Sequence, residues 1–186
     1  MVQNKTNKDM EIILVLLRER DHLRGIARML NESHSTVQRR IGELEKENVV
    51  DYRMEGRNKT FFLKGNLQAK NYIYSAERYK LAKLLKKYPH LSMICDDVLK
   101  SVNSRMIVLF GSYAKFSAKA DSDIDIYIDA PDEKAKRKAE GINSKIRAKT
   151  GKFDTSSLLI KEIIRNHVIL RGIEDFYEKS RFFEQA

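Results

Sequence analysis

Hydrophobic residues recur at two different spacings along this chain, and the change of spacing divides it into segments. In residues 8–48 they fall three and four positions apart, which predicts three amphipathic helices. Residues 49–63 read instead as two short strands around a polar turn that contains Gly56. In residues 67–88 the helical spacing returns, and another helix is expected after Pro89, because proline is well tolerated in the first turn of a helix.

The pattern changes again after residue 105. Residues 106–110 and 124–128 are apolar or alternating runs that suit buried strands, and a helical pattern follows over residues 132–149. Strands mixed with helices indicate an α+β chain. We therefore expect a first domain in residues 1–66, a helical connector in residues 67–91 and a second domain in residues 92–186.

Composition narrows the class of protein. Hydrophobic residues make up 42% of the chain and charged residues 33%, which indicates a folded core and excludes a disordered chain. The single cysteine, Cys95, excludes an intrachain disulfide and a cysteine-built zinc site, and favours a cytoplasmic location. The longest early apolar run, residues 12–17, is far shorter than the ~20 residues of a spanning helix, so we expect no membrane segment.

The chain is basic, with 36 Lys and Arg against 26 Asp and Glu and a net charge of +10. Such an excess favours anionic partners such as nucleic acid or nucleotides.

The first 65 residues resemble a winged helix-turn-helix domain, with two short helices, a polar turn at residues 31–33 and a hairpin. Burial of Val37, Ile41 and Leu44 would point the polar residues of the second helix outward, where they suit contacts to DNA phosphates and base edges. Winged helices also serve as dimerisation or protein-docking modules, and that alternative stays open. The residues expected to bind DNA are Ser35, Thr36, Gln38, Arg39, Arg40, Arg57 and Lys59.

Two carboxylates share one face of the expected strand at residues 124–128. Alternate side chains of a strand point the same way, so Asp123 and Asp125 lie together while the alternating isoleucines, at positions 124, 126 and 128, face the core. Neighbouring carboxylates repel, and a divalent cation removes the repulsion; oxygen ligands favour Mg²⁺ or Mn²⁺. Upstream, Gly111 and Ser112 follow a strand and open a helix, where the backbone can approach a phosphate. Together these features predict phosphoryl or nucleotidyl transfer.

Gly111-Ser112, followed after ten residues by Asp123-x-Asp125, resembles the nucleotidyltransferases of the DNA polymerase β superfamily, particularly its minimal domains. The resemblance covers residues 92–186 and implies a mixed sheet flanked by helices. It implies that Gly111 and Ser112 bind the nucleoside triphosphate and that Asp123 and Asp125 are catalytic ligands of Mg²⁺ or Mn²⁺. Many members have a second glycine in the loop, where this chain has Phe116.

The family also uses a third carboxylate, on a later strand, to hold metal and activate the attacking hydroxyl. Asp154, which follows Gly151, is the expected catalytic and metal-binding residue, on a strand beside the Asp-x-Asp strand. Asp129 is the alternative, because its even offset from Asp125 places it on the same face.

The resemblance implies transfer of an NMP group, with ATP as the expected substrate, to an acceptor hydroxyl of a protein, an RNA or a small molecule. A second hypothesis belongs to a different class: a DNA-binding transcription regulator, or an antitoxin-like repressor, whose nucleotidyltransferase-like domain only senses nucleotide. The long helix expected over residues 67–88 offers a contact surface for a homodimer, and the oligomeric state stays open.

Overall fold

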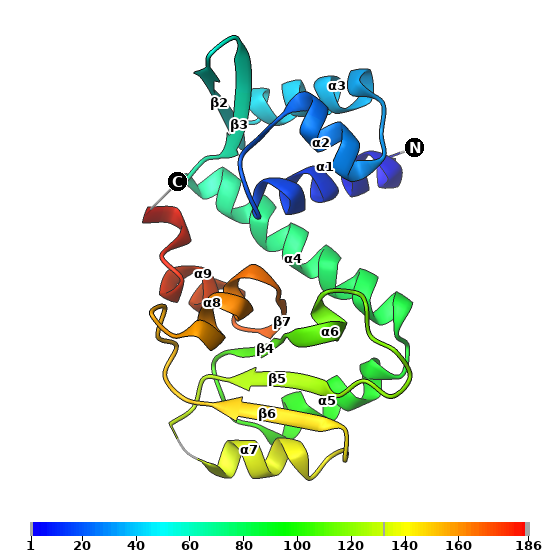
Figure 1. Cartoon of the computed structure of the whole chain (residues 1–186), viewed down its shortest axis with the longest axis vertical. Helices are drawn as coiled ribbons and strands as arrows, with labels where there is room; N and C mark the ends of the chain where they lie inside the picture. Colours follow the sequence, from blue (N-terminus) through cyan, green and yellow to red (C-terminus); the bar gives the residue numbers. More distant parts are fainter. Residues whose placement is uncertain (1, 132, 185–186) are drawn as a thin grey trace. The chain divides into compact units, whose positions relative to one another are not determined.

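The computed structural model describes residues 2–131 and 133–184, with side chains from residue 7 onward, and it divides into two compact units (Figure 1). Unit 1 contains the described residues up to Tyr79 together with residues 182–184. Unit 2 contains Lys80–Arg181. The change from one unit to the other falls inside helix α4 (Leu67–Lys87). Within the described ranges no helix is both long and apolar enough to cross a membrane.

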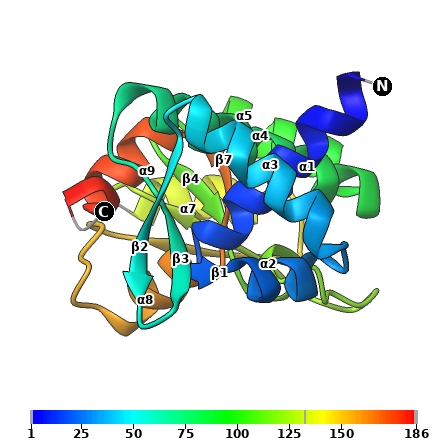
Figure 2. The ribbon, with the colours of Figure 1, turned by 90° about the horizontal axis from the view of Figure 1, so that it is seen from above.

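Unit 1 combines helices with a three-stranded antiparallel sheet of order β1-β3-β2 (Figure 2). The hairpin predicted from the hydrophobic pattern is present, and Glu55 pairs with Asn58 across a turn in which Gly56 has φ +62°. The elements of this unit, besides the first part of α4, are α1 (Val2–Leu16), β1 (Asp21–His22), α2 (Leu23–Leu30), α3 (His34–Lys46), β2 (Val50–Glu55), β3 (Asn58–Leu63) and the 3-10 helix η1 (Phe182–Glu184).

The predicted exposure of one residue of helix α3 is wrong. Arg40 was expected to face outward, but it is only 1% exposed, and its guanidinium pairs with Asp9 of α1 and with Glu43 of α3. The reason is helical geometry: Arg40 lies three residues after Val37 and four before Leu44, so it shares their buried face. Arg40 is therefore a core residue of unit 1, and the expectation that it contacts DNA is wrong.

Unit 2 is built on a four-stranded mixed sheet of order β6-β5-β4-β7, in which β5 and β6 pair in parallel and β4 pairs antiparallel with both β5 and β7. The sheet matches the expected mixed arrangement flanked by helices. Besides the end of α4, the elements are α5 (Leu91–Ser101), β4 (Ile107–Leu109), α6 (Gly111–Ala114), β5 (Ile124–Ile128), α7 (Glu133–Glu140), β6 (Ile146–Thr150), α8 (Leu158–Arg165), β7 (Val168–Arg171) and α9 (Ile173–Lys179).

The two faces of this sheet differ in character. On one face the apolar residues of β5 and β6 pack against α5 and α7, and α7 runs alongside β6 in Figure 1. On the other face Tyr127 of β5 contacts Phe153, which in turn contacts Phe176 of α9, with ring centroids 5.8 and 5.6 Å apart. The second face is therefore aromatic at the end of β5, and it is polar at the beginning of that strand.

The helix expected over residues 132–149 is wrong in its second half. Helix α7 ends at Glu140, Gly141 follows, and β6 begins at Ile146. Residues 146–150 alternate buried and exposed side chains, which is the pattern of a strand with one covered face. Asp132, where the helix was expected to begin, lies outside the described residues.

Candidate functional site

The site begins where β4 ends, at a close approach between Gly111 and Asp125. The Phe110 amide donates to the carbonyl of Asp125 at 2.9 Å, which ties the end of β4 to β5. Gly111 has φ +69°, and a Cβ added there would lie 2.1 Å from Oδ2 of Asp125. Only glycine meets both requirements, because other residues pay for the left-handed backbone and would displace the carboxylate.

Helix α6, which follows, is a single turn of four residues. Such a short helix develops little dipole, so phosphate contact would depend on the backbone at Gly111 and on Ser112. The Ser112 carbonyl accepts hydrogen bonds from the amide of Ser117 at 3.0 Å and from its hydroxyl at 3.3 Å, which close the loop behind it.

Phe116 occupies the loop position where the resemblance described above favours a second glycine, and its backbone conformation is one that glycine adopts most easily. Its φ is +57°, which costs a side-chain-bearing residue about 1 kcal/mol relative to glycine. Its amide donates to the Tyr113 carbonyl at 2.9 Å, and its carbonyl accepts from Nζ of Lys87 at 2.6 Å. The half-buried ring packs against the core of unit 2, and this packing offsets the backbone cost.

Asp123 and Asp125 flank Ile124 at the start of β5. The side chain of Asp123 is 49% exposed, whereas Asp125 is half-buried. The pKa of Asp125 is raised, first by burial and then by the negative charge of Asp123. A divalent cation would relieve both causes, and an all-oxygen donor pair fits Mg²⁺ or Mn²⁺. The two residues thus suit a hard divalent ion.

Two basic residues stand on the neighbouring strand, and the sequence reasoning missed both. Arg147 of β6 is in register with Asp125, and Lys149 is in register with Tyr127. Nη2 of Arg147 lies 3.3 Å from Oδ1 of Asp123. The alternation of apolar and basic residues over 146–150 was the available signal, but the segment was assigned to a helix.

Asp154 lies in a turn instead of on a strand. Its Oδ1 accepts hydrogen bonds from the amide and the hydroxyl of Ser156, at 2.9 and 2.8 Å, and these bonds hold the pKa of Asp154 below its usual range. The strand beside β5 is β6, which ends at Thr150, before Gly151. The expected strand at Asp154 is therefore wrong.

The alternative third carboxylate is also engaged elsewhere, since Asp129 pairs with Lys179 of α9. Among residues 2–131 and 133–184, no three His, Cys, Asp or Glu side chains are grouped closely enough to hold a metal ion. The structure thus brings Asp123, Asp125 and Gly111 together and does not add Asp154 or Asp129 to them.

The residues expected to bind DNA divide into three groups. Thr36 is half-buried, and its hydroxyl is 2.8 Å from the hydroxyl of Ser33, the N-cap of α3. Arg40 is buried, as described above. The exposed members are Ser35, Gln38 and Arg39 of α3 and Arg57 and Lys59 of the hairpin.

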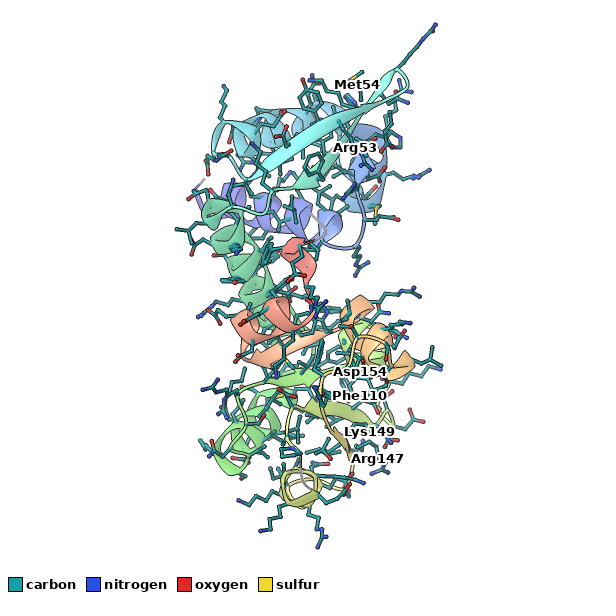
Figure 3. All side chains as sticks on the ribbon, turned by 90° about the vertical axis from the view of Figure 1, so that its left-hand side faces the viewer. Arg53, Met54, Phe110, Arg147, Lys149 and Asp154 are labelled. Carbon is teal, nitrogen blue, oxygen red and sulfur yellow. The ribbon has the colours of Figure 1, made fainter. Side chains whose placement is uncertain are left out.

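The exposed side chains of the hairpin also include an aromatic ring and a methionine. Nζ of Lys59 lies 3.6 Å from the centroid of the Tyr52 ring, and Met54 is 58% exposed. Figure 3 shows Arg53 and Met54 on this hairpin; Arg53 pairs with Glu55 at 2.8 Å.

Replacing Gly111 by alanine is expected to destabilise unit 2 by about 2 kcal/mol, because the new Cβ meets a left-handed backbone and the Asp125 carboxylate. Urea unfolding followed by circular dichroism measures the loss. Gly42→Ala is the matched control: its Cβ meets nothing within 4 Å, so a small stabilisation is expected from the higher helix propensity of alanine. Equal stability of Gly111→Ala and the wild type would contradict the close approach.

Comparison with known proteins bears on unit 2. A family model described as "Polymerase beta, Nucleotidyltransferase" matches residues 80–181, which is more than half of the chain. The match covers Gly111, Ser112, Asp123 and Asp125. No curated protein and no solved structure gives a significant match.

Proposed function

Because this chain belongs to the polymerase β nucleotidyltransferase family, we propose that unit 2 transfers an NMP group from a nucleoside triphosphate to an acceptor hydroxyl, with a divalent cation held by its acidic pair. The observation that carries the proposal is the contact between Gly111 and Asp125. It places a carboxylate that suits a metal ion directly against the glycine turn that opens α6, where backbone groups can contact a phosphate.

Each residue then has a distinct role. Bound Mg²⁺ or Mn²⁺ would neutralise charge on the phosphates and on the leaving pyrophosphate. Asp123 and Asp125 hold the ion, and the bare α carbon of Gly111 leaves room for the Asp125 carboxylate. The backbone at Gly111 contacts the phosphates, and the Ser112 hydroxyl donates a hydrogen bond to a phosphate oxygen. The acceptor oxygen attacks the α-phosphorus, the bond to pyrophosphate breaks, and the hydroxyl proton passes to water.

The direct test uses the full chain with each of the four α-³²P-labelled NTPs, in Mg²⁺, in Mn²⁺ and in EDTA. Pyrophosphate release and label transfer are measured with the protein itself and with total RNA as acceptors. We expect cation-dependent turnover, with ATP as the preferred nucleotide. Absence of both turnover and nucleotide binding for all four NTPs would contradict the proposal.

A second candidate function is nucleotide sensing without transfer. It is favoured by the ion pair between Arg147 and Asp123, which occupies one carboxylate of the pair. It is also favoured because, among residues 2–131 and 133–184, no third His, Cys, Asp or Glu side chain is grouped with the pair closely enough to hold a metal ion. Equilibrium binding of ATP with Mg²⁺, without pyrophosphate release, would favour this alternative over the enzyme.

We also propose that unit 1 is a winged helix-turn-helix domain that binds DNA. It is supported by the order of its elements, three helices followed by the β2–β3 hairpin. The exposed polar residues Gln38 and Arg39 stand on α3, the helix expected to read the major groove. Arg57 and Lys59 stand on the hairpin, the element expected to meet the phosphate backbone.

Replacing Arg57 by alanine is expected to weaken binding of all duplexes by a similar factor and to lower the salt-dependence slope by about 1, since one phosphate contact is lost. Fluorescence anisotropy with labelled genomic duplexes at several salt concentrations measures both quantities. Arg78→Ala, an exposed charge on α4 in the same unit, is the control and should change neither. An unchanged slope for Arg57→Ala would rule out the hairpin contact.

A further inference from the structure

Two cations stand on the same sheet face as the acidic pair. Arg147 and Lys149 are exposed, whereas Ile146 and Ala148 between and beside them are buried in the core. Alternation along β6 therefore directs both basic side chains to the face that carries Asp125. Figure 3 shows both on the same side of unit 2 as Phe110, the residue that precedes Gly111 in sequence.

The Arg147 guanidinium is held by three acceptors. Its Nη1 donates to the carbonyls of Ser144 and Ile146, at 2.8 and 3.2 Å, and its Nη2 lies 3.3 Å from Oδ1 of Asp123. Because the guanidinium is planar and rigid, the two carbonyls fix its orientation beside the carboxylate. The side chains of Arg147 and Asp123 are 54% and 49% exposed, so solvent reaches the pair and its separation costs little.

The position of the Arg147 guanidinium affects the binding of a free metal ion and of a metal–triphosphate complex in opposite directions. A free divalent cation that binds Oδ1 of Asp123 displaces the guanidinium from that oxygen, and one bound through the other oxygens of the pair still lies close to the positive charge of Arg147. A nucleoside triphosphate carries more negative charge than one divalent cation cancels, and guanidinium groups bind phosphate oxygens through paired hydrogen bonds. The same side chain therefore opposes the metal alone and favours the metal with its triphosphate.

We propose that Arg147 makes the acidic pair selective for the metal–triphosphate complex over the free metal ion, by pairing with Asp123 in the empty site and with a phosphate oxygen in the occupied one. The inference rests on the proposed function of this site and adds a specificity-determining residue to it. Lys149, two positions along the same face, supplies a second positive charge toward the triphosphate.

The test compares two binding constants of the full chain by isothermal titration calorimetry: Mn²⁺ alone, and Mn²⁺ with an ATP analogue that has a methylene group between the α- and β-phosphorus. In Arg147→Ala we expect Mn²⁺ alone to bind about two- to fivefold more tightly, since an exposed ion pair no longer competes. The analogue complex should bind about tenfold more weakly, since a charge-assisted contact is lost.

Two further variants separate this role from a general effect of charge. Lys138→Ala removes one exposed positive charge from α7 in the same unit and should change neither constant. Arg147→Lys keeps the charge but loses the paired geometry, so it should resemble the wild type toward Mn²⁺ alone and resemble Arg147→Ala toward the analogue.

The outcomes distinguish failure of the selectivity of Arg147 from failure of the nucleotide site itself. If the wild type binds both ligands and Arg147→Ala shifts both affinities in the same direction, or neither, selectivity by Arg147 is overturned while the nucleotide site stands. If the wild type binds neither ligand, the proposed function fails and this inference fails with it. Opposite shifts for the two ligands, absent from Lys138→Ala, would support Arg147 as the selective residue.

Discussion

The double replacement Asp123→Asn and Asp125→Asn is expected to lower the rate of NMP transfer by at least about 10³-fold. Asparagine keeps the shape of aspartate but removes the negative charge that attracts a divalent cation. Charge neutralisation by a metal ion lowers the activation free energy of such reactions by several kcal/mol, and each ~1.36 kcal/mol corresponds to a factor of ten in rate. Pyrophosphate release with labelled ATP measures the loss.

The same variant is expected to fold at least as well as the wild type. Burial and the charge of Asp123 raise the pKa of Asp125, so its ionised form is less favourable in the folded protein than in the unfolded chain. The folded state then loses stability as the pH rises from the ordinary value of 3.8 through the raised pKa. In EDTA the variant should therefore have an equal or higher Tm at neutral pH, and this difference should disappear below pH 3.8.

Asp121→Asn is the matched control for the catalytic measurement. Asp121 is exposed and lies two residues before Asp123, so its replacement removes a nearby charge and leaves the acidic pair intact. Its transfer rate should stay within about twofold of the wild type, as for other surface substitutions. Equal transfer by the double variant and by Asp121→Asn would remove the acidic pair from the mechanism.

Replacing Arg40 by alanine is expected to destabilise unit 1 by about 3 kcal/mol. The change leaves the Asp9 carboxylate buried beside an empty volume, and breaking a buried ion pair by removing one partner is strongly destabilising. Burial raises the pKa of Asp9, although Arg40 acts in the opposite direction. Without Arg40 the Asp9 carboxyl can take up a proton, which keeps the loss of folding free energy at the low end of the range for broken buried ion pairs. Urea unfolding by circular dichroism measures the free energy of unfolding.

Arg39→Ala is the neighbouring control for that experiment. The Arg39 side chain is 63% exposed and pairs with Glu43 on the surface of α3 at 3.0 Å, so its loss should cost at most about 0.5 kcal/mol. A second variant, Arg40→Met with Asp9→Leu, replaces the pair by apolar groups and should recover much of the stability. Comparable costs for Arg39→Ala and Arg40→Ala would show that Arg40 is not a core residue.

The hydrophobic pattern predicted the elements that have a strong period and clear breaks. The β2–β3 hairpin, β4, β5 and helix α4 lie where it placed them, because each carries several apolar residues that the fold buries. The pattern failed at β6, where only two buried residues alternate with Arg147 and Lys149. The alternation in that segment is too short to be distinguished from a continuation of the preceding helical pattern.

The sequence anticipated the placement of candidate site residues where residues close together in the chain form the arrangement. Asp123 and Asp125 are brought together by strand alternation alone, and Gly111 was identified by its position after a buried strand. Prediction failed where distant segments decide the environment. Arg40 was assigned to the surface although it shares the helix face of Val37 and Leu44, because a buried charge needs a partner and that partner, Asp9, lies on another helix. Asp154 was assigned to a strand because the position of β6 was missed.

The sequence by itself determined the local chemistry of this protein: a carboxylate pair on one strand face, a glycine-serine turn before it, and a family match that follows from these residues and their surroundings. Only the tertiary structure decided which side chains lie beside the carboxylate pair. The parallel pairing of β5 and β6 places Arg147 in register with Asp125, and its guanidinium beside Asp123. Strand alternation is a property of adjacent residues, whereas strand pairing depends on the packing of the whole sheet, so the charge that balances the acidic pair emerges only from the fold.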